Sequence, residues 1–148
     1  MNSVVCYLEQ NGQYLMLNRN KKKDDLNGGK WIGVGGKVEP RESPEEALLR
    51  EVKEETGLTL THYTRRGLVT FCSGDITEYM FVYTADGFEG TLADCNEGEL
   101  HWVDKAAVLS LPLWEGDRRF LPLLSESNPY FSLKLIYENG RLIHSRFY

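Results

Sequence analysis

The segment G-K-V-E-P-R-E-S-P-E-E-A-L-L-R-E-V-K-E-E-T-G-L, residues 36–58, carries signals for both ends of one helix. Ser43 is a suitable N-cap, and the glutamate three residues later completes a capping box. Pro44 fits the first helical position, where the missing N–H has no partner to lose. Gly57 fits the left-handed backbone position just beyond a helix end. The sequence therefore predicts a helix over residues 44–56.

The predicted helix has an apolar face and an acidic face when it is wound at about 100° per residue. Glu51, Glu54 and Glu55 stand at i, i+3 and i+4, so they share one face. Ala47 lies on that face one turn earlier, where its small side chain leaves room for a ligand. Arg50 has acids four residues away on both sides and can pair with either. The stripe that we assign to the core consists of Leu48, Leu49, Val52 and Thr56.

The three carboxylates repel one another, since like charges at i and i+4 destabilise a helix by about 0.2–0.5 kcal/mol per pair. A bound cation would reverse the sign of this contribution. Mg2+ prefers oxygen ligands, keeps several waters and also binds substrate phosphates, and Mn2+ is the alternative ion. The cluster therefore indicates metal-assisted phosphate chemistry. A solvated acidic face, which is common on helices rich in glutamate, is the alternative interpretation.

This segment resembles the signature of the Nudix hydrolases at every defined position. The matching positions are Gly36, Glu42, Arg50, Glu51, Val52, Glu54, Glu55, Gly57 and Leu58. The resemblance implies an α/β fold, an α/β/α sandwich around a mixed, curved β-sheet, with the acidic helix packed on one side. It also implies one domain over residues 1–148 and the hydrolysis of a nucleoside diphosphate linked to another group.

The same resemblance assigns metal-binding and catalytic roles. The implied metal ligands on the signature are Glu51, Glu54, Glu55 and the backbone carbonyl of Gly36. The metals would polarise phosphorus and lower the pKa of an attacking water. A further carboxylate is expected from the acidic connection before Trp102, where alignment on that tryptophan favours Glu97 over Glu99. Either Glu51 or Glu97 would accept the proton, and an ordinary acidic loop is the alternative for this connection.

Residues around the acidic helix are expected to support it or to contact phosphates. Glu42 and Arg50 would brace the glycine loop against the helix. Arg19 ends a predicted strand and begins the polar, mostly basic run 19–25, and it is the stronger candidate for a phosphate contact. Lys37, directly after the glycine-rich stretch, would also point at a phosphate. A solvated loop and an ordinary surface lysine are the alternatives.

Substrate recognition lies outside the signature. The region around Trp114 resembles the C-terminal part of MutT-type members, which cleave oxidised purine nucleoside triphosphates with a tryptophan against the base and an acid on its polar edge. Trp114 and Asp117 match these positions, and Phe71 can line the same pocket. Stacking on an aromatic face contributes about 1–3 kcal/mol per base. Gly116 and Ile32 stand where two further polar readers are expected, and core filling is the alternative for Trp114.

Composition limits the class of protein. The 148 residues suit one domain with a sizeable core, and 41% hydrophobic and 26% charged residues are typical of soluble globular proteins. A net charge of −5 argues against a nucleic-acid polymer as partner. The three cysteines show no disulfide or zinc pattern. No signal peptide or membrane-spanning stretch is predicted, so we expect a cytoplasmic monomer or homodimer.

Turn signals divide the rest of the chain into strands and short helices. Asn-Gly pairs at residues 11–12 and 139–140 predict hairpins. The predicted strands cover residues 3–9, 13–19, 59–72, 76–85, 100–103, 131–137 and 141–147. The predicted short helices cover residues 105–109, capped by Asp104, and 115–126, with Phe120, Leu121 and Leu124 packing inward.

The resemblance to MutT-type members leads us to expect hydrolysis of a purine nucleoside triphosphate to monophosphate and pyrophosphate. 8-oxo-dGTP is the best single candidate, and the implied role is cleaning the nucleotide pool, which supports DNA repair. The alternative enzymes act on another nucleoside diphosphate derivative or on a pterin triphosphate. A nucleotide-sensing module without turnover and a structural interaction domain are the alternatives from other classes. The complete acid set argues against a sensor, because a binding module has no need for every metal ligand.

Overall fold

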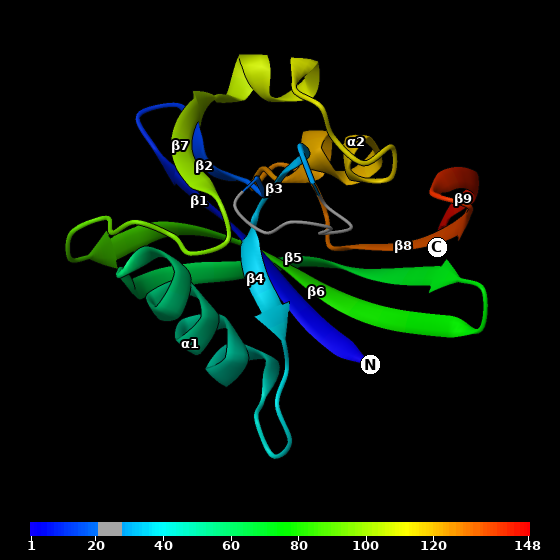
Figure 1. The fold of residues 1–148 in the computed structure, drawn as a ribbon, viewed down its shortest axis with the longest axis horizontal. Helices are drawn as coiled ribbons and strands as arrows, with labels where there is room; N and C mark the ends of the chain where they lie inside the picture. The colour runs from blue at the N-terminus through cyan, green and yellow to red at the C-terminus, as the bar shows by residue number, and fades with distance from the viewer. Residues whose placement is uncertain (21–27) are drawn as a thin grey trace.

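In the computed structural model, which describes residues 1–20 and 28–148, the chain folds around one mixed, curved β-sheet (Figure 1). The strands are β1 (Asn2–Gln10), β2 (Gln13–Asn18), β3 (Trp31–Ile32), β4 (Val34–Lys37), β5 (Thr59–Ser73), β6 (Ile76–Glu89), β7 (Glu99–Asp104), β8 (Phe131–Glu138) and β9 (Arg141–Phe147). The helical segments are α1 (Pro44–Thr56), α2 (Asp117–Phe120) and the 3-10 turns η1 (Lys105–Ser110) and η2 (Leu121–Leu123). The expected mixed sheet is confirmed.

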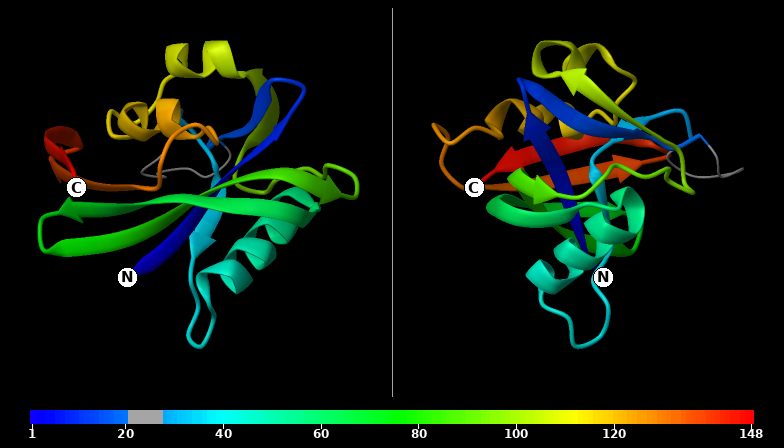
Figure 2. Two further views of the ribbon diagram at one scale, coloured as in Figure 1. Left: turned by 180° about the vertical axis from the view of Figure 1, so that it is seen from behind. Right: turned by 90° about the vertical axis from the view of Figure 1, so that its left-hand side faces the viewer.

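Strand β1 lies at the centre of the sheet and pairs in parallel with β6 and antiparallel with β2 and β4. The main path runs β3-β2-β1-β6-β5-β8-β9, while β4 joins β1 and β7 joins β2. The views in Figures 1 and 2 place α1 on one side of the sheet and η1, α2 and η2 on the other. The expected three-layer arrangement is therefore present, with short turns rather than a long helix in the second outer layer.

Alternation along β1 divides the core into two clusters. Successive side chains of a strand point to opposite faces. Val4 and Cys6 pack in the cluster beneath α1, whereas Val5 and Tyr7 pack in the cluster beneath α2 together with Phe120. All five are less than a tenth exposed, and burying a side chain of this size contributes roughly 1.5–3 kcal/mol. Strand β1 is therefore packed on both faces, between the two outer layers.

Helix α1 begins and ends as the sequence predicts. The Ser43 hydroxyl accepts a hydrogen bond from the Glu46 N–H at 3.0 Å, and the Glu46 carboxylate accepts one from the Ser43 N–H at 2.9 Å. Gly57 has a φ of 79°. Two assignments on its faces are wrong. Leu49 is 37% exposed because the buried stripe is narrower than expected, and Ala47 is fully buried because the acidic face borders the sheet.

The second half of the chain departs from the prediction in three places. The helix expected over 115–126 is only α2 followed by η2, because Pro122 has no N–H to continue an α-helix. Its predicted inward residues Phe120, Leu121 and Leu124 are nevertheless buried. Asp104 gives no side-chain cap to η1, and β6 continues to Glu89, beyond the predicted end at residue 85.

Two further predictions concern the basic run over residues 19–25 and membrane-spanning segments. The predicted loop over residues 19–25 falls mostly on residues 21–27, which lie outside the described residues. Within residues 1–20 and 28–148, no helix is long and apolar enough to cross a bilayer.

Candidate active site

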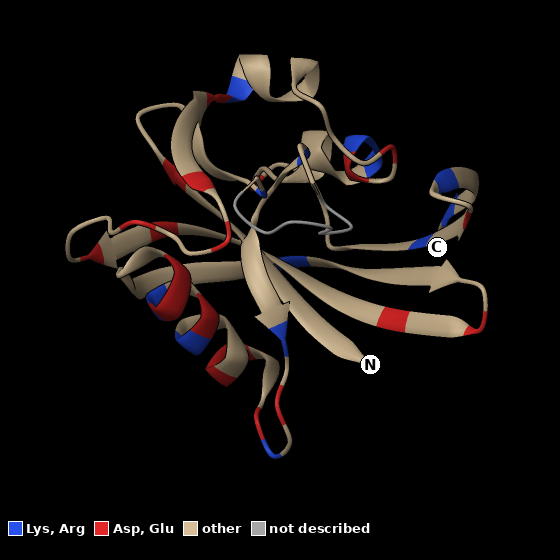
Figure 3. Ribbon diagram, in the orientation of Figure 1, with Lys and Arg blue, Asp and Glu red and all other residues tan. Residues whose placement is uncertain are grey.

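The three acids of α1 differ in exposure. The Glu51 side chain is 15% exposed and the Glu54 side chain is 60% exposed. The Oε2 atom of Glu55 is buried and has no hydrogen-bond partner in the part of the chain that the structure describes. Figure 3 shows acidic residues along α1 and on the segment that leads into β7. The helix therefore presents two enclosed carboxylates and one at the solvent edge.

The enclosed carboxylates resist ionisation. Burial, together with the charges of Glu97 and Glu51, raises the pKa of Glu55 to about 8, while a backbone hydrogen bond from Gly35 opposes the shift. Burial also raises the pKa of Glu51, against the opposing hydrogen bond and charge of Arg50. A positive charge bound beside Glu55 would favour its ionised form.

Arg50 connects the signature loop to the acidic helix. Its Nε and Nη2 donate to the two Glu42 carboxylate oxygens at 2.7 and 3.0 Å, and Nη2 also donates to the Lys37 carbonyl at 3.0 Å. Its Nη1 lies 2.8 Å from Glu51 Oε1 and 3.3 Å from Glu54 Oε2. The Arg50 hydrogen bonds, together with one from the Glu39 N–H, lower the pKa of Glu42 to about 2. The predicted contact between loop and helix is thus present, and Arg50 pairs with Glu54 rather than with Glu46.

The connection before β7 brings one of its two candidate acids to the helix. Glu97 Oε2 lies 3.2 Å from Arg19 Nη1, and its charge acts on both enclosed carboxylates of α1. Glu99 instead accepts a hydrogen bond from Asn20 at 3.1 Å, with more than half of its side chain exposed. Gly98 allows this turn to pass close to Asn18, since a Cβ at position 98 would overlap the Asn18 carbonyl oxygen.

The residues fit a divalent metal ion, although they are not arranged as a closed ligand cage. Among the described residues, no three His, Cys, Asp or Glu side chains already converge as metal ligands. Arg50 explains why these acids do not converge on one point, because it pairs with both Glu51 and Glu54. The buried Oε2 of Glu55 has no hydrogen-bond partner within the described ranges of the chain, and clustered carboxylate oxygens are the donors that hard divalent ions prefer.

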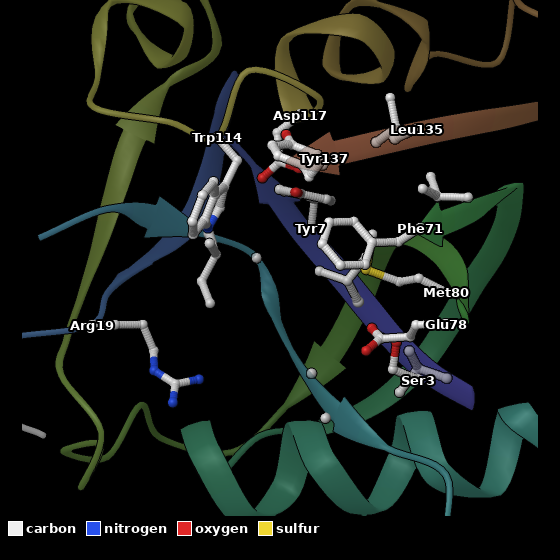
Figure 4. A pocket seen from close by; sticks show the side chains of 17 residues that line it. Ser3, Tyr7, Arg19, Phe71, Glu78, Met80, Trp114, Asp117, Leu135 and Tyr137 are labelled. Atoms are coloured by element: carbon white, nitrogen blue, oxygen red, sulfur yellow. The ribbon is translucent and has the colours of Figure 1, made fainter. Parts of the chain in front are cut away.

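A cavity of about 290 Å³ lies between the central sheet and the α2 layer (Figure 4). Aromatic rings form much of its wall: the Trp114 ring meets the Tyr137 ring edge-on at 5.8 Å, and Phe71 lies 5.1 Å from Tyr137. The Lys30 ammonium lies 4.9 Å from the Trp114 ring centroid. The lining residues are Ser3, Val4, Val5, Tyr7, Arg19, Ile32, Gly33, Gly35, Gly36, Val69, Phe71, Glu78, Met80, Trp114, Asp117, Leu135 and Tyr137. Such a wall suits a flat aromatic ligand.

Asp117 brings a titratable carboxyl to the aromatic end of the cavity. Burial raises its pKa to about 7. The neighbouring Gly116 donates its N–H to the Tyr137 hydroxyl at 2.7 Å. A Cβ at position 116 would lie 2.5 Å from Leu135 Cδ1 and 2.8 Å from that hydroxyl. The packing therefore explains why no second acid stands before Asp117, since Tyr137 and Leu135 fill the space that it would need.

The cavity and the acid cluster share a wall. Three residues that line the cavity each contact one acid of the cluster. Gly35 donates its backbone N–H to Glu55, and Arg19 pairs with Glu97. A Cβ at Gly36 would lie 2.5 Å from the carboxyl carbon of Glu51. The aromatic cavity thus borders the acid cluster through these three residues.

Comparisons with known proteins agree with this arrangement. The NUDIX domain family matches residues 1–124. The chain belongs to the Nudix family. The solved structure of a mutator MutT protein from Bacillus halodurans superposes with a TM-score of 0.88 at 27% identity, and the match covers 99% of this chain and 96% of that one. The overall Nudix fold is therefore confirmed.

Two curated relatives have names that state different nucleotide substrates. The oxidized purine nucleoside triphosphate hydrolase of Danio rerio is 33% identical over 111 residues, which cover 74% of this chain and 71% of that protein. The CTP pyrophosphohydrolase of Escherichia coli (strain K12) is 33% identical over 123 residues, which cover 82% and 86%. The protein is thus a Nudix hydrolase, and such hydrolases use divalent metal ions.

Most of the expected substrate-binding residues of this Nudix hydrolase lie together. Arg19, Phe71, Trp114 and Asp117 all line the cavity, whereas the exposed Lys37 side chain does not. The sequence analysis did not identify four polar or sulfur-containing residues of the same wall, Ser3, Tyr7, Glu78 and Met80, nor Leu135 and Tyr137 on β8. Alternation along each strand was the signal available for these residues, because residues two apart on β1, β6 and β8 face the same side of the sheet.

Proposed function

We propose that this Nudix hydrolase cleaves purine nucleoside triphosphates to nucleoside monophosphate and pyrophosphate, with 8-oxo-dGTP as the leading candidate. The observation that carries the proposal is the wall shared by the aromatic cavity and the acid cluster. A base stacked on Trp114 would leave its phosphate chain beside the helix that carries the carboxylates. The role that follows is removal of damaged nucleotides from the pool. The named relative from Danio rerio supports this choice of substrate class.

Each residue has a distinct part in the proposed reaction. Glu51, Glu54, Glu55, Glu97 and the Gly36 carbonyl would hold Mg2+ or Mn2+. When bound, such an ion polarises the phosphate and lowers the pKa of water. Water attacks phosphorus, the bond between the α- and β-phosphates breaks, and pyrophosphate leaves. Either Glu51 or Glu97 accepts the proton of that water.

The remaining residues orient the substrate. Arg19 lies at the cavity wall beside Glu97, where its guanidinium can neutralise phosphate charge. Trp114 and Phe71 bury the base, and Asp117 contacts its polar edge. Arg50 and Glu42 hold the glycine loop against α1 so that the carbonyl of Gly36 stays beside Glu51.

A pyrimidine triphosphate is the second candidate. The CTP pyrophosphohydrolase of Escherichia coli is as similar in identity as the purine enzyme and covers more of this chain. Gly116 and Ile32 also leave fewer polar groups to distinguish one base from another. A nucleoside diphosphate derivative and a pterin triphosphate remain the further candidates.

The test is a nucleotide panel with Mg2+, in which products are separated and pyrophosphate is measured. The panel compares 8-oxo-dGTP, dGTP, CTP, a nucleoside diphosphate sugar and a pterin triphosphate. The proposal predicts the highest kcat/KM for a purine triphosphate and equal amounts of monophosphate and pyrophosphate. A higher value for CTP would favour the pyrimidine candidate. Tight binding of nucleotides without any product would instead favour a sensing module.

A further inference from the structure

Ser3 and Glu78 form a polar pair in the wall of the cavity. The Ser3 hydroxyl, on β1, donates a hydrogen bond to Glu78 Oε2, on β6, at 2.7 Å. Ser3 is only 7% exposed, and both residues line the same cavity as Trp114 and Asp117. The two residues are 75 positions apart in the sequence. The parallel pairing of β1 with β6 brings them together, with Ser3 opposite Met80.

The pair lies on the side of the cavity nearer to α1. Figure 4 shows Trp114 and Asp117 at the end away from α1, and Glu78 with Ser3 nearer to that helix. The sheet register agrees, because Ser3 pairs with Lys37, the residue after Gly36. In a nucleotide the sugar joins the base to the phosphates. A base on Trp114 and phosphates beside α1 would therefore place the sugar near the Ser3–Glu78 pair.

The chemistry of the pair selects a particular kind of ligand group. An ionised carboxylate only accepts hydrogen bonds, so it repels phosphate and attracts O–H or N–H donors. Its cavity neighbours Phe71 and Met80 donate none. At the base end, Asp117 and the Tyr137 hydroxyl already supply polar groups. The donors that remain for Glu78 are the hydroxyls of the sugar, which acidic residues also bind in dinucleotide-binding folds.

We propose that Glu78, positioned by Ser3, accepts hydrogen bonds from the sugar hydroxyls of the bound nucleotide and so determines which sugars the enzyme accepts. This inference rests on the proposed nucleotide hydrolysis. Hydroxyl-to-carboxylate bonds are charge-assisted and stronger than neutral ones. The acceptor is fixed before the ligand arrives, because the buried Ser3 hydroxyl already holds one of its oxygens.

The test compares a substrate that has both sugar hydroxyls with one that has neither. For wild type, Glu78→Leu and Ser3→Ala, kcat/KM is measured for GTP and for 2′,3′-dideoxy-GTP. We expect wild type to favour GTP by about tenfold to a hundredfold, and Glu78→Leu to bring the ratio close to one. Ser3→Ala should lower the ratio to an intermediate value. Glu89→Gln, an exposed acid at the far end of β6, is the matched control and should keep the wild-type ratio.

Two results would overturn the inference. One is the same GTP to dideoxy-GTP ratio in wild type and Glu78→Leu. The other is an altered preference between guanine and adenine triphosphates with the sugar ratio unchanged, which would assign Glu78 to the base. If the melting curve of Glu78→Leu shows that it does not fold, Glu78→Gln replaces it. Its ratio of kcat/KM for GTP to that for 2′,3′-dideoxy-GTP should lie between the wild-type ratio and one.

The sugar contact can be tested even if the proposed hydrolysis is not observed. If wild type hydrolyses no nucleoside triphosphate, the shift in melting temperature with GMP and with 2′,3′-dideoxy-GMP becomes the readout. A larger shift with GMP that Glu78→Leu abolishes would support the sugar contact even then. Equal shifts with both nucleotides would reject it.

Discussion

Gly36 lies directly against the carboxylate of Glu51. A methyl group built on Gly36 would lie 2.5 Å from the carboxyl carbon of Glu51 and 2.6 Å from both of its oxygens. The obstacle is the far end of a flexible side chain, so the fold can accommodate the methyl group by moving Glu51. The position of this acid thus depends on the absence of a side chain at residue 36.

Gly36→Ala is therefore expected to lower kcat by about a hundredfold, because a shift of about 1 Å in a catalytic group costs that much. Its melting temperature should stay close to that of wild type. Gly35→Ala is the matched comparison, since its Cβ would lie 1.9 Å from the backbone oxygen of Val4 and should destabilise the sheet. Wild-type kcat in a folded Gly36→Ala protein would show that Glu51 need not stay in place.

Glu54→Gln and Glu55→Gln should each reduce kcat by at least about a hundredfold, because each removes one charged oxygen ligand from the proposed metal site. Both variants should remain folded. Glu46→Gln on the same helix is the control, since glutamine also completes a capping box. Steady-state pyrophosphate release provides the measurement, and full activity in both acid variants would refute their assignment as ligands.

Trp114→Ala should raise KM by about fivefold to a hundredfold, the equivalent of one lost stacking contact. Trp114→Phe keeps an aromatic face and should lose much less. Circular dichroism of both variants distinguishes this role from core filling. An unfolded Trp114→Ala protein, or a folded one with unchanged nucleotide affinity, would favour the packing role.

Asp117→Asn should make stability less dependent on pH. The Asp117 pKa is about 7 in the fold against an ordinary value of 3.8, so the folded state retains a proton that the unfolded state loses. The contribution of Asp117 to the free energy of unfolding should therefore fall as pH rises from about 4 to 7, and level off above. Asparagine does not titrate, so the variant should lack this contribution to the pH dependence.

Urea unfolding at pH 5 and pH 8 measures this difference. The stability of Asp117→Asn relative to wild type should increase by about 3 kcal/mol between the two values, as an upper estimate for an enclosed carboxyl. Equal differences at both pH values would mean that Asp117 titrates normally.

Local chemistry explains why α1 and its acids could be predicted. The cap at Ser43, the stop at Gly57 and the spacing of the glutamates all lie within one continuous segment. The exposure of Leu49 and the burial of Ala47 could not be predicted equally well, because they depend on where the sheet meets the helix. Helical spacing defines which residues share a face, but not how far the sheet extends over it.

The cavity shows the opposite case. Glu78 reaches the site through the parallel pairing of β6 with β1, and Tyr137 through that of β8 with β5. Such pairings join residues far apart in sequence, so no local pattern indicates them. The resemblance to MutT-type enzymes identified Trp114 and Asp117, whereas the reason for Gly116 became evident only from the packing of Leu135 and Tyr137.

Binding of Mn2+, as a spectroscopic substitute for Mg2+, tests the central claim most directly. Electron paramagnetic resonance would follow the free ion during titration of wild type and of a variant that combines Glu51→Gln, Glu54→Gln and Glu55→Gln. The account predicts that wild type binds Mn2+, that nucleotide strengthens this binding, and that the combined variant loses the protein site. Equal Mn2+ binding by both proteins, with and without nucleotide, would contradict it.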